Sequence, residues 1–240
     1  MNTFTRRFAL LVVLLGICAI PAAAQKSREQ LTAELTGLRQ QMAEIDRALL
    51  LPGAEDLATY AAFTQGSESG VVRLMPRCLP PIVSSVREGG AFYSFIDRTH
   101  EYGSSSAIVL ENGRLSTGFS GANFGFLKPI GDVRLEYLTT ETESVRSLII
   151  YVPPQSEPAA RVEQAKFHSR ADPLYVDRIE AKVNQTYLVR SISYGNSDAL
   201  VAFRVVRKDT DGSLILVWKM LRKYPVPQLD RYPSDPRPGN

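Results

Sequence analysis

The segment Asp209-Thr210-Asp211-Gly212-Ser213 constrains the fold of this chain more than any other stretch. It separates two runs of residues with high strand propensity, 200–208 and 214–221. A three-residue loop with glycine at its last position is typical of a tight β-hairpin, because glycine adopts positive φ at little cost. The segment therefore predicts two adjacent antiparallel strands, and a third strand is predicted at 187–192.

The predicted turn also fixes a register, in which Val206 faces Leu216 and Arg204 faces Trp218. Because a guanidinium stacks well on an indole, we expect Arg204 to lie against Trp218. Both faces of this hairpin are mostly apolar, whereas an antiparallel sheet with one face in water alternates apolar and polar residues. The hairpin is therefore expected inside a sandwich or under a helix, with Trp218 buried.

The sequence predicts a mainly β fold: an antiparallel β-sandwich or jelly-roll-like body over 89–224, preceded by a coiled-coil-type helix. Further strands are predicted at 92–96, 107–111, 115–119, 124–127, 134–139 and 147–152. The dipeptide Asn112-Gly113 is a strong hairpin signal, and Pro158 begins a predicted short helix reaching His168. Residues 52–88 are expected to form a linker with a short helix and a Pro-rich loop, and 225–240 a Pro-rich tail.

Residues 25–51 are predicted to form an amphipathic heptad helix. Its apolar residues recur at alternating steps of four and three: Leu31, Leu35, Leu38, Met42, Ile45 and Leu49. That spacing is the seam of a coiled coil, whereas a helix packed on its own domain usually has a wider apolar stripe. We expect a homo-oligomer formed through this seam; the alternative is a helix folded back on its own β body.

The first 24 residues have the features of a cleaved signal peptide. Arg6 and Arg7 precede an apolar run at 8–20, and small residues at 22–24 suit a cleavage site. Export to the periplasm or the exterior is expected, with no stable membrane anchor after cleavage. The mature chain would carry 26 basic and 25 acidic residues, a balance that gives no reason to expect a nucleic-acid partner. It would keep one cysteine, Cys78, which is expected to be buried.

The sequence contains few groups suited to catalysis. It has two histidines, and it lacks a phosphate-binding loop, a dinucleotide fingerprint and the G-x-S-x-G elbow of serine hydrolases. No metal and no cofactor is predicted. The weak catalytic candidates are Asp97, His100, Glu101 and Glu111, since paired carboxylates hydrolyse glycosides when they meet at the right distance. Tyr93, Tyr102, Phe119 and Phe124 are candidate ligand-binding residues, because exposed aromatic rings line glycan and peptide grooves.

Two classes of function follow from these features. The leading prediction is a secreted or cell-envelope binding or assembly module without enzymatic activity, with a glycan or a protein as ligand. The alternative is a secreted hydrolase of glycosidase type that uses carboxylates near Asp97, Glu101 and Glu111. The two classes differ in whether these side chains converge in one pocket.

Overall fold

The computed structural model describes residues 26–66, 68–77, 86–119, 122–169 and 175–230. The chain divides into two compact units, Met1–Gln41 and Met42–Asn240, and the boundary falls within helix α2 (Arg28–Leu50). The predicted signal peptide and Cys78 lie outside the described residues. Among the residues described, no helix combines the length and the apolar character needed to cross a membrane.

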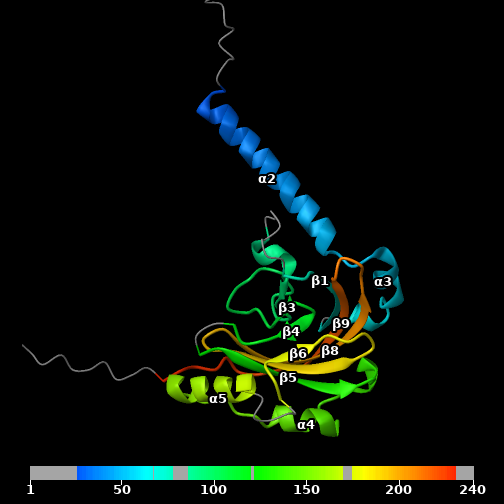
Figure 1. The fold of residues 1–240 in the computed structure, drawn as a ribbon, viewed down its shortest axis with the longest axis vertical. Coiled ribbons are helices and arrows are strands. Elements are labelled where there is room, and N and C mark those ends of the chain that lie inside the picture. The colour runs from blue at the N-terminus through cyan, green and yellow to red at the C-terminus, as the bar shows by residue number, and fades with distance from the viewer. Residues whose placement is uncertain (1–25, 67, 78–85, 120–121, 170–174, 231–240) are drawn as a thin grey trace, which may run out of the picture. The chain divides into compact units, whose positions relative to one another are not determined.

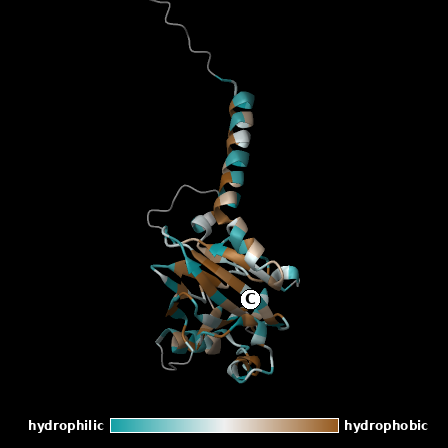
Figure 2. Ribbon diagram, turned by 90° about the vertical axis from the view of Figure 1, so that its right-hand side faces the viewer, coloured by the Kyte–Doolittle hydropathy of each residue, from teal (hydrophilic) through white to brown (hydrophobic). Residues whose placement is uncertain are grey.

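Helix α2 matches the N-terminal helix predicted from the sequence. Ser27 caps it: its hydroxyl accepts a hydrogen bond from the Gln30 backbone N–H at 3.2 Å, and the Gln30 side chain accepts one from the Ser27 N–H at 2.9 Å. Apolar segments recur between polar ones along this helix (Figure 2). Leu31, Leu35, Leu38, Ile45 and Leu49 are between 47% and 60% exposed. The apolar stripe of α2 is therefore largely open to solvent.

The body is mostly antiparallel β structure in two sheets. The central sheet has five strands in the order β1-β9-β8-β7-β5. Its strands span Ser69–Leu74 (β1), Leu214–Lys223 (β9), Ser197–Lys208 (β8), Thr186–Ser193 (β7) and Phe124–Gly131 (β5). The outer sheet has four strands in the order β2-β3-β4-β6. They span Phe92–Tyr93 (β2), Ile108–Glu111 (β3), Arg114–Ser116 (β4) and Arg178–Glu180 (β6).

Both faces of the central sheet are covered (Figure 1). One face packs on the outer sheet, in a core that joins Val201, Phe203 and Trp218 to Ile108 and Leu115. The other face packs on helices α4 (Glu143–Ile149) and α5 (Glu157–Ser169). The expectation that the apolar hairpin is buried on both sides is therefore confirmed, and each side is covered by a different layer.

Two predicted strands are helices in the structure. The segment predicted as a strand at 134–139 contains the 3-10 turn Leu135–Tyr137, and the first half of the one predicted at 147–152 falls in α4. The buried residues Val145 and Leu148 are three apart, which is helical spacing, while Val152 in the apolar run that favoured a strand is 80% exposed. The strand prediction relied on β-branched residues that face solvent.

The segment 52–88 contributes more than a linker. It contains helix α3 (Ala54–Thr59) and the edge strand β1, which pairs antiparallel with β9. The predicted helix near His168 is present as α5, and the Asn112-Gly113 hairpin is present with both residues at positive φ. The β body therefore begins before residue 89.

The turn at 209–213 forms as predicted. Gly212 has φ of +85°, and the Asp209 N–H donates to the Ser213 carbonyl at 2.9 Å. Lys208 pairs with Leu214, as the predicted register requires. A β-bulge at Val206 then shifts the pairs from Val205 to Val201 by one residue, so that Phe203 faces Trp218, and a second irregularity between Val201 and Leu200 restores the register.

The predicted contact between Arg204 and Trp218 is wrong, because the bulge moves Arg204 off that position. The Arg204 guanidinium instead donates to Asp132 at 2.6 Å. Trp218 is 1% exposed, as expected, and the guanidinium carbon of Arg98 lies 5.4 Å from the centroid of its ring. An arginine therefore packs on the indole, but it comes from a loop rather than from the neighbouring strand.

Candidate functional site

Two adjoining cavities form a groove beside the outer sheet. The smaller has a volume of about 210 Å³ and the larger about 650 Å³, and they share Tyr102, Gly118 and Phe119. The smaller cavity lies over the ends of β5 and β7, and the larger one lies between the outer sheet and α5. The shared residues make the two cavities one continuous groove.

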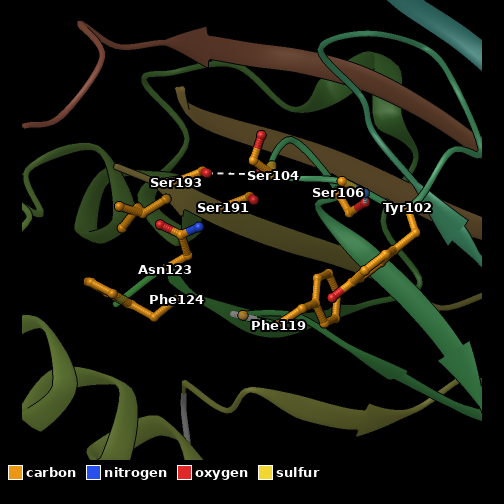
Figure 3. A pocket seen from close by; sticks show the side chains of 11 residues that line it. Tyr102, Ser104, Ser106, Phe119, Asn123, Phe124, Ser191 and Ser193 are labelled. Carbon is orange, nitrogen blue, oxygen red and sulfur yellow. Dashed lines mark hydrogen bonds between the residues drawn. The ribbon is translucent and has the colours of Figure 1, made fainter. Parts of the chain in front are cut away.

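The smaller cavity is lined mainly by hydroxyl and amide groups, contributed by Ser104, Ser106, Ser191, Ser193 and Asn123. Figure 3 shows the serines gathered near its centre, with the rings of Tyr102 and Phe119 close together at one end. The Ser193 hydroxyl donates to the Ser104 carbonyl at 2.6 Å, and the Asn123 side-chain oxygen accepts from the Tyr194 N–H at 2.9 Å. These contacts fix the polar groups in place.

An aromatic cluster lines the groove where the two cavities meet. The ring of Phe92 lies 4.6 Å from that of Tyr102 and 5.1 Å from that of Phe119, both edge to face. Gly118 directs Phe119 into this cluster: it has φ of +79°, and a Cβ there would lie 3.1 Å from the Cα of Phe124. Only glycine fits that corner without strain.

Arg77 supplies a fixed cation on the sheet side of the larger cavity. Its guanidinium donates to Glu88 at 2.9 Å and to Glu111 at 3.2 Å, and its backbone N–H donates to the Leu110 carbonyl at 2.8 Å. The hydrogen bond to Glu88 raises the pKa of Arg77, and the charge of Glu111 acts in the same direction. Arg77 therefore stays charged and anchored at the edge of β3.

The opposite side of the larger cavity carries residues from α5 and β6. The Gln164 side chain donates to the Asn123 carbonyl at 3.3 Å, and His168 Nδ1 lies 2.7 Å from a carboxylate oxygen of Asp177. Arg178 donates to the Ser116 hydroxyl at 3.1 Å and forms no ion pair with another described residue. The groove thus combines aromatic rings, neutral hydrogen-bonding groups and the guanidinium of Arg178.

The four catalytic candidates do not line one cavity. The Asp97 carboxylate accepts from the Ser94 hydroxyl at 3.2 Å, within a turn. His100 Nε2 lies 2.8 Å from the Arg73 carbonyl, to which it donates, and burial lowers the pKa of His100. Glu101 lines a different cavity from Glu111, which lies in the groove. The structure therefore brings no two of the candidate carboxylates together around a substrate-sized space.

Three of the four ligand-binding candidates lie together. Tyr102, Phe119 and Phe124 line the smaller cavity, although they come from separate segments. Tyr93 instead packs in the core, with its ring 5.2 Å from that of Phe95 and 6.4 Å from that of Trp218. Burial raises the pKa of Tyr93 to about 12.

Sequence reasoning missed Arg77, Gln164, Arg178 and the serines of the groove. These residues come from a loop, a helix and strands that are distant along the chain, so no local spacing identifies them. In the part of the chain that the structure describes, no three side chains of His, Cys, Asp or Glu are grouped so as to hold a metal ion. Comparisons of the chain with protein-family models, with curated proteins and with solved structures give no match.

Proposed function

We propose that this chain is an exported binding and assembly module without enzymatic activity. Helix α2 would associate with copies of itself as a coiled coil, and the two sheets would form a sandwich-like body that presents the groove to a ligand. The observation that carries this proposal is the apolar stripe of α2. Five of its six residues are at least 47% exposed, and they keep the spacing of a coiled-coil seam.

Charged residues beside the stripe favour parallel helices. If Leu31 and Leu38 occupy d positions, Glu34 occupies a g position and Arg39 the following e position. In a parallel coiled coil a g residue meets the e residue five places further along the partner helix. Glu34 of one helix would therefore meet Arg39 of the next, with opposite charges. A second copy of this chain thus suits both the apolar and the charged pattern.

Light scattering of the mature chain tests the assembly. Leu38→Asp with Met42→Asp places two carboxylates in the seam, where burial without partners is costly, and should convert the oligomer to monomer. The matched control is Ala33→Asp with Gln40→Asp, which adds the same charge on the opposite face of α2 and should leave the oligomer intact. A wild-type chain that is monomeric at micromolar concentration contradicts the assembly, and so does equal dissociation by both pairs.

The groove favours a glycan as the ligand. Aromatic rings stack on the apolar faces of sugars, and the hydroxyl and amide groups beside them match sugar hydroxyls. Calorimetric titration with neutral oligosaccharides should give saturable binding that Phe119→Ala abolishes. Tyr137→Ala removes an aromatic ring that is 70% exposed and lines no part of the groove, so it should leave binding unchanged. If the two variants bind alike, the groove is not the glycan site.

The glycosidase-type alternative requires two carboxylates on either side of one bond. Glu111 is held by Arg77, while Asp97 and Glu101 lie outside the groove. No geometry among the described residues favours this alternative. The same titrations test it, because a hydrolase would consume the oligosaccharide and release shorter products.

A further inference from the structure

A second pocket lies on the other side of the central sheet, among β5, α4 and α5. Its volume is about 380 Å³, and it shares no lining residue with the groove. Four aromatic side chains form most of its wall: Phe126, Tyr151, Phe167 and Tyr175. A volume of this size suits a small molecule, and a mostly aromatic lining is usual for binding pockets.

The four rings that line the pocket are inclined to one another and do not form a single stack. Tyr151 and Tyr175 each stand nearly perpendicular to Phe126, at interplanar angles of 73° and 79° and centroid distances of 5.1 and 5.4 Å. Phe167 lies 4.6 Å from Phe126 at an angle of 33°. The rings thus line the pocket from several directions, as in an aromatic cage.

One carboxylate, that of Glu163, stands at the pocket and is partly exposed. It accepts a hydrogen bond from the Tyr151 hydroxyl at 3.1 Å and forms an ion pair with Lys166. Burial raises the pKa of Tyr151, and the charge of Glu163 raises it further, so the hydroxyl remains a donor. The pocket therefore holds the negative charge of Glu163. The cation paired with it is Lys166, a long side chain that is 57% exposed.

The other polar groups of the pocket are already engaged. The Tyr175 hydroxyl donates to Ser147 at 2.6 Å, and the Tyr151 hydroxyl is committed to Glu163. A ligand rich in hydroxyls would find few free partners here. A ligand that brings methyl groups and a positive charge needs none, because ring faces attract cations and methyl groups pack on rings. The Lys128 ammonium lies 5.4 Å from the Tyr175 ring centroid and donates to the Ser144 carbonyl at 3.1 Å, so it is a like charge beside this ring that Glu163 has to offset.

We propose that the pocket formed by Phe126, Tyr151, Phe167 and Tyr175 binds an organic cation of the quaternary-ammonium class, with Glu163 as its counter-charge. The ligand would displace Lys166 from Glu163 and place its methyl groups against the rings. This proposal is independent of the assembly through α2 and of the glycan groove, since none of their residues takes part.

Calorimetric titration of the full mature chain with choline tests the proposal, and 3,3-dimethylbutan-1-ol is the matched ligand. The two compounds have the same shape, but only choline is charged. Choline should bind saturably, and the neutral compound should bind at least several-fold more weakly. Equal binding of both would show a merely apolar pocket and overturn the proposal, as would no binding of choline at millimolar concentration.

Three variants locate the site and separate charge from packing. Glu163→Gln keeps the size of the side chain and removes its charge, so choline binding should weaken several-fold. Lys166→Gln removes the competing cation, so binding should tighten, an outcome that simple loss of structure would not produce. Glu157→Gln lies on the same helix, pairs with Arg161 and lines no part of the pocket, so it should bind as wild type. Weaker binding by Lys166→Gln, or an equal loss in Glu157→Gln, would contradict the assignment.

Discussion

The apolar residues of α2 and those of the central sheet differ in what covers them. In the sheet, Phe203 and Leu200 are each 0% exposed, because the outer sheet covers the face of the first and two helices cover the face of the second. In α2, Leu38 and Leu49 are each 52% exposed. Both patterns are periodic and use similar residues. The apolar residues of the sheet are covered within one chain, whereas those of the helix are largely exposed to solvent.

This difference predicts that the unfolding of the body and the association of α2 respond to different substitutions. Substitutions in the body should change the free energy of unfolding and leave association unchanged. Substitutions in the stripe of α2 should change association and leave the unfolding of the body unchanged. The following substitutions test that separation.

The largest effect is expected at the buried ion pair of Arg190 and Asp198. The guanidinium is 0% exposed, donates to Asp198 at 2.5 and 2.8 Å, and donates to the Leu148 carbonyl of α4 at 2.8 Å. Asp198→Ala leaves that charge buried without its carboxylate counter-charge and should lower the free energy of unfolding by about 3–5 kcal/mol. Urea denaturation measures the change.

The surface pair of Lys223 and Glu68 provides the control for that measurement. Both side chains are about half exposed, so Lys223→Met should change stability by less than about 1 kcal/mol. Light scattering should show the wild-type oligomer in both variants under native conditions. A folded Asp198→Ala chain that fails to associate would break the separation between the two regions.

A smaller effect is expected at the hairpin turn. Gly212→Val forces a β-branched residue to φ of +85° and should destabilise the body by about 1–3 kcal/mol. Gly103→Ala is the matched change, because Gly103 lacks a positive φ and a Cβ there meets no atom within 4 Å. Thermal melting compares the two. Equal melting temperatures would show that the turn is not strained by the substitution.

Trp218 reports the burial of the core between the sheets. It is the single tryptophan of the chain and is 1% exposed, so its emission should be blue-shifted and resist quenching by iodide. Arg98→Gln removes the guanidinium above the indole and should shift the emission, whereas Arg204→Gln should not, since Arg204 pairs with Asp132. A shift of the emission in the Arg204 variant alone would indicate that Arg204 lies against the indole, as in the register without a bulge.

The smallest effect is expected from His100. Because burial lowers its pKa below the ordinary 6.5, the unfolded chain takes up a proton at a higher pH than the folded chain. The stability contributed by the neutral ring is complete above pH 6.5 and is lost as the pH falls through the lowered pKa. His100→Gln keeps an N–H donor for the Arg73 carbonyl but does not titrate. Between about pH 7 and about pH 5, its unfolding free energy should fall less than that of wild type.

The sequence predicted the local features of the fold better than the tertiary ones. The helix at α2, the turn at Gly212 and the burial of Trp218 follow from spacing and backbone preference, which act within a few residues. The bulge at Val206 has no signal in the local spacing, and a strand was predicted over part of α4 because Ile149, Ile150 and Val152, at and just beyond its C-terminal end, are β-branched. Tyr102, Phe119 and Phe124 were predicted to bind a ligand, but Arg77 and Arg178 reach the groove only through the fold.

Disulfide trapping at Leu31 tests the central claim most directly. In the mature chain, which lacks residues 1–24 and with them Cys18, and which carries Cys78→Ser, Leu31→Cys places a single thiol at the N-terminal end of the stripe. Parallel helices bring that position next to its own copy, so mild oxidation should give a covalent dimer. Ala33→Cys, on the opposite face of α2, should stay monomeric under the same conditions. Equal cross-linking at both positions, or none at Leu31→Cys, would contradict the association of α2 through its apolar stripe.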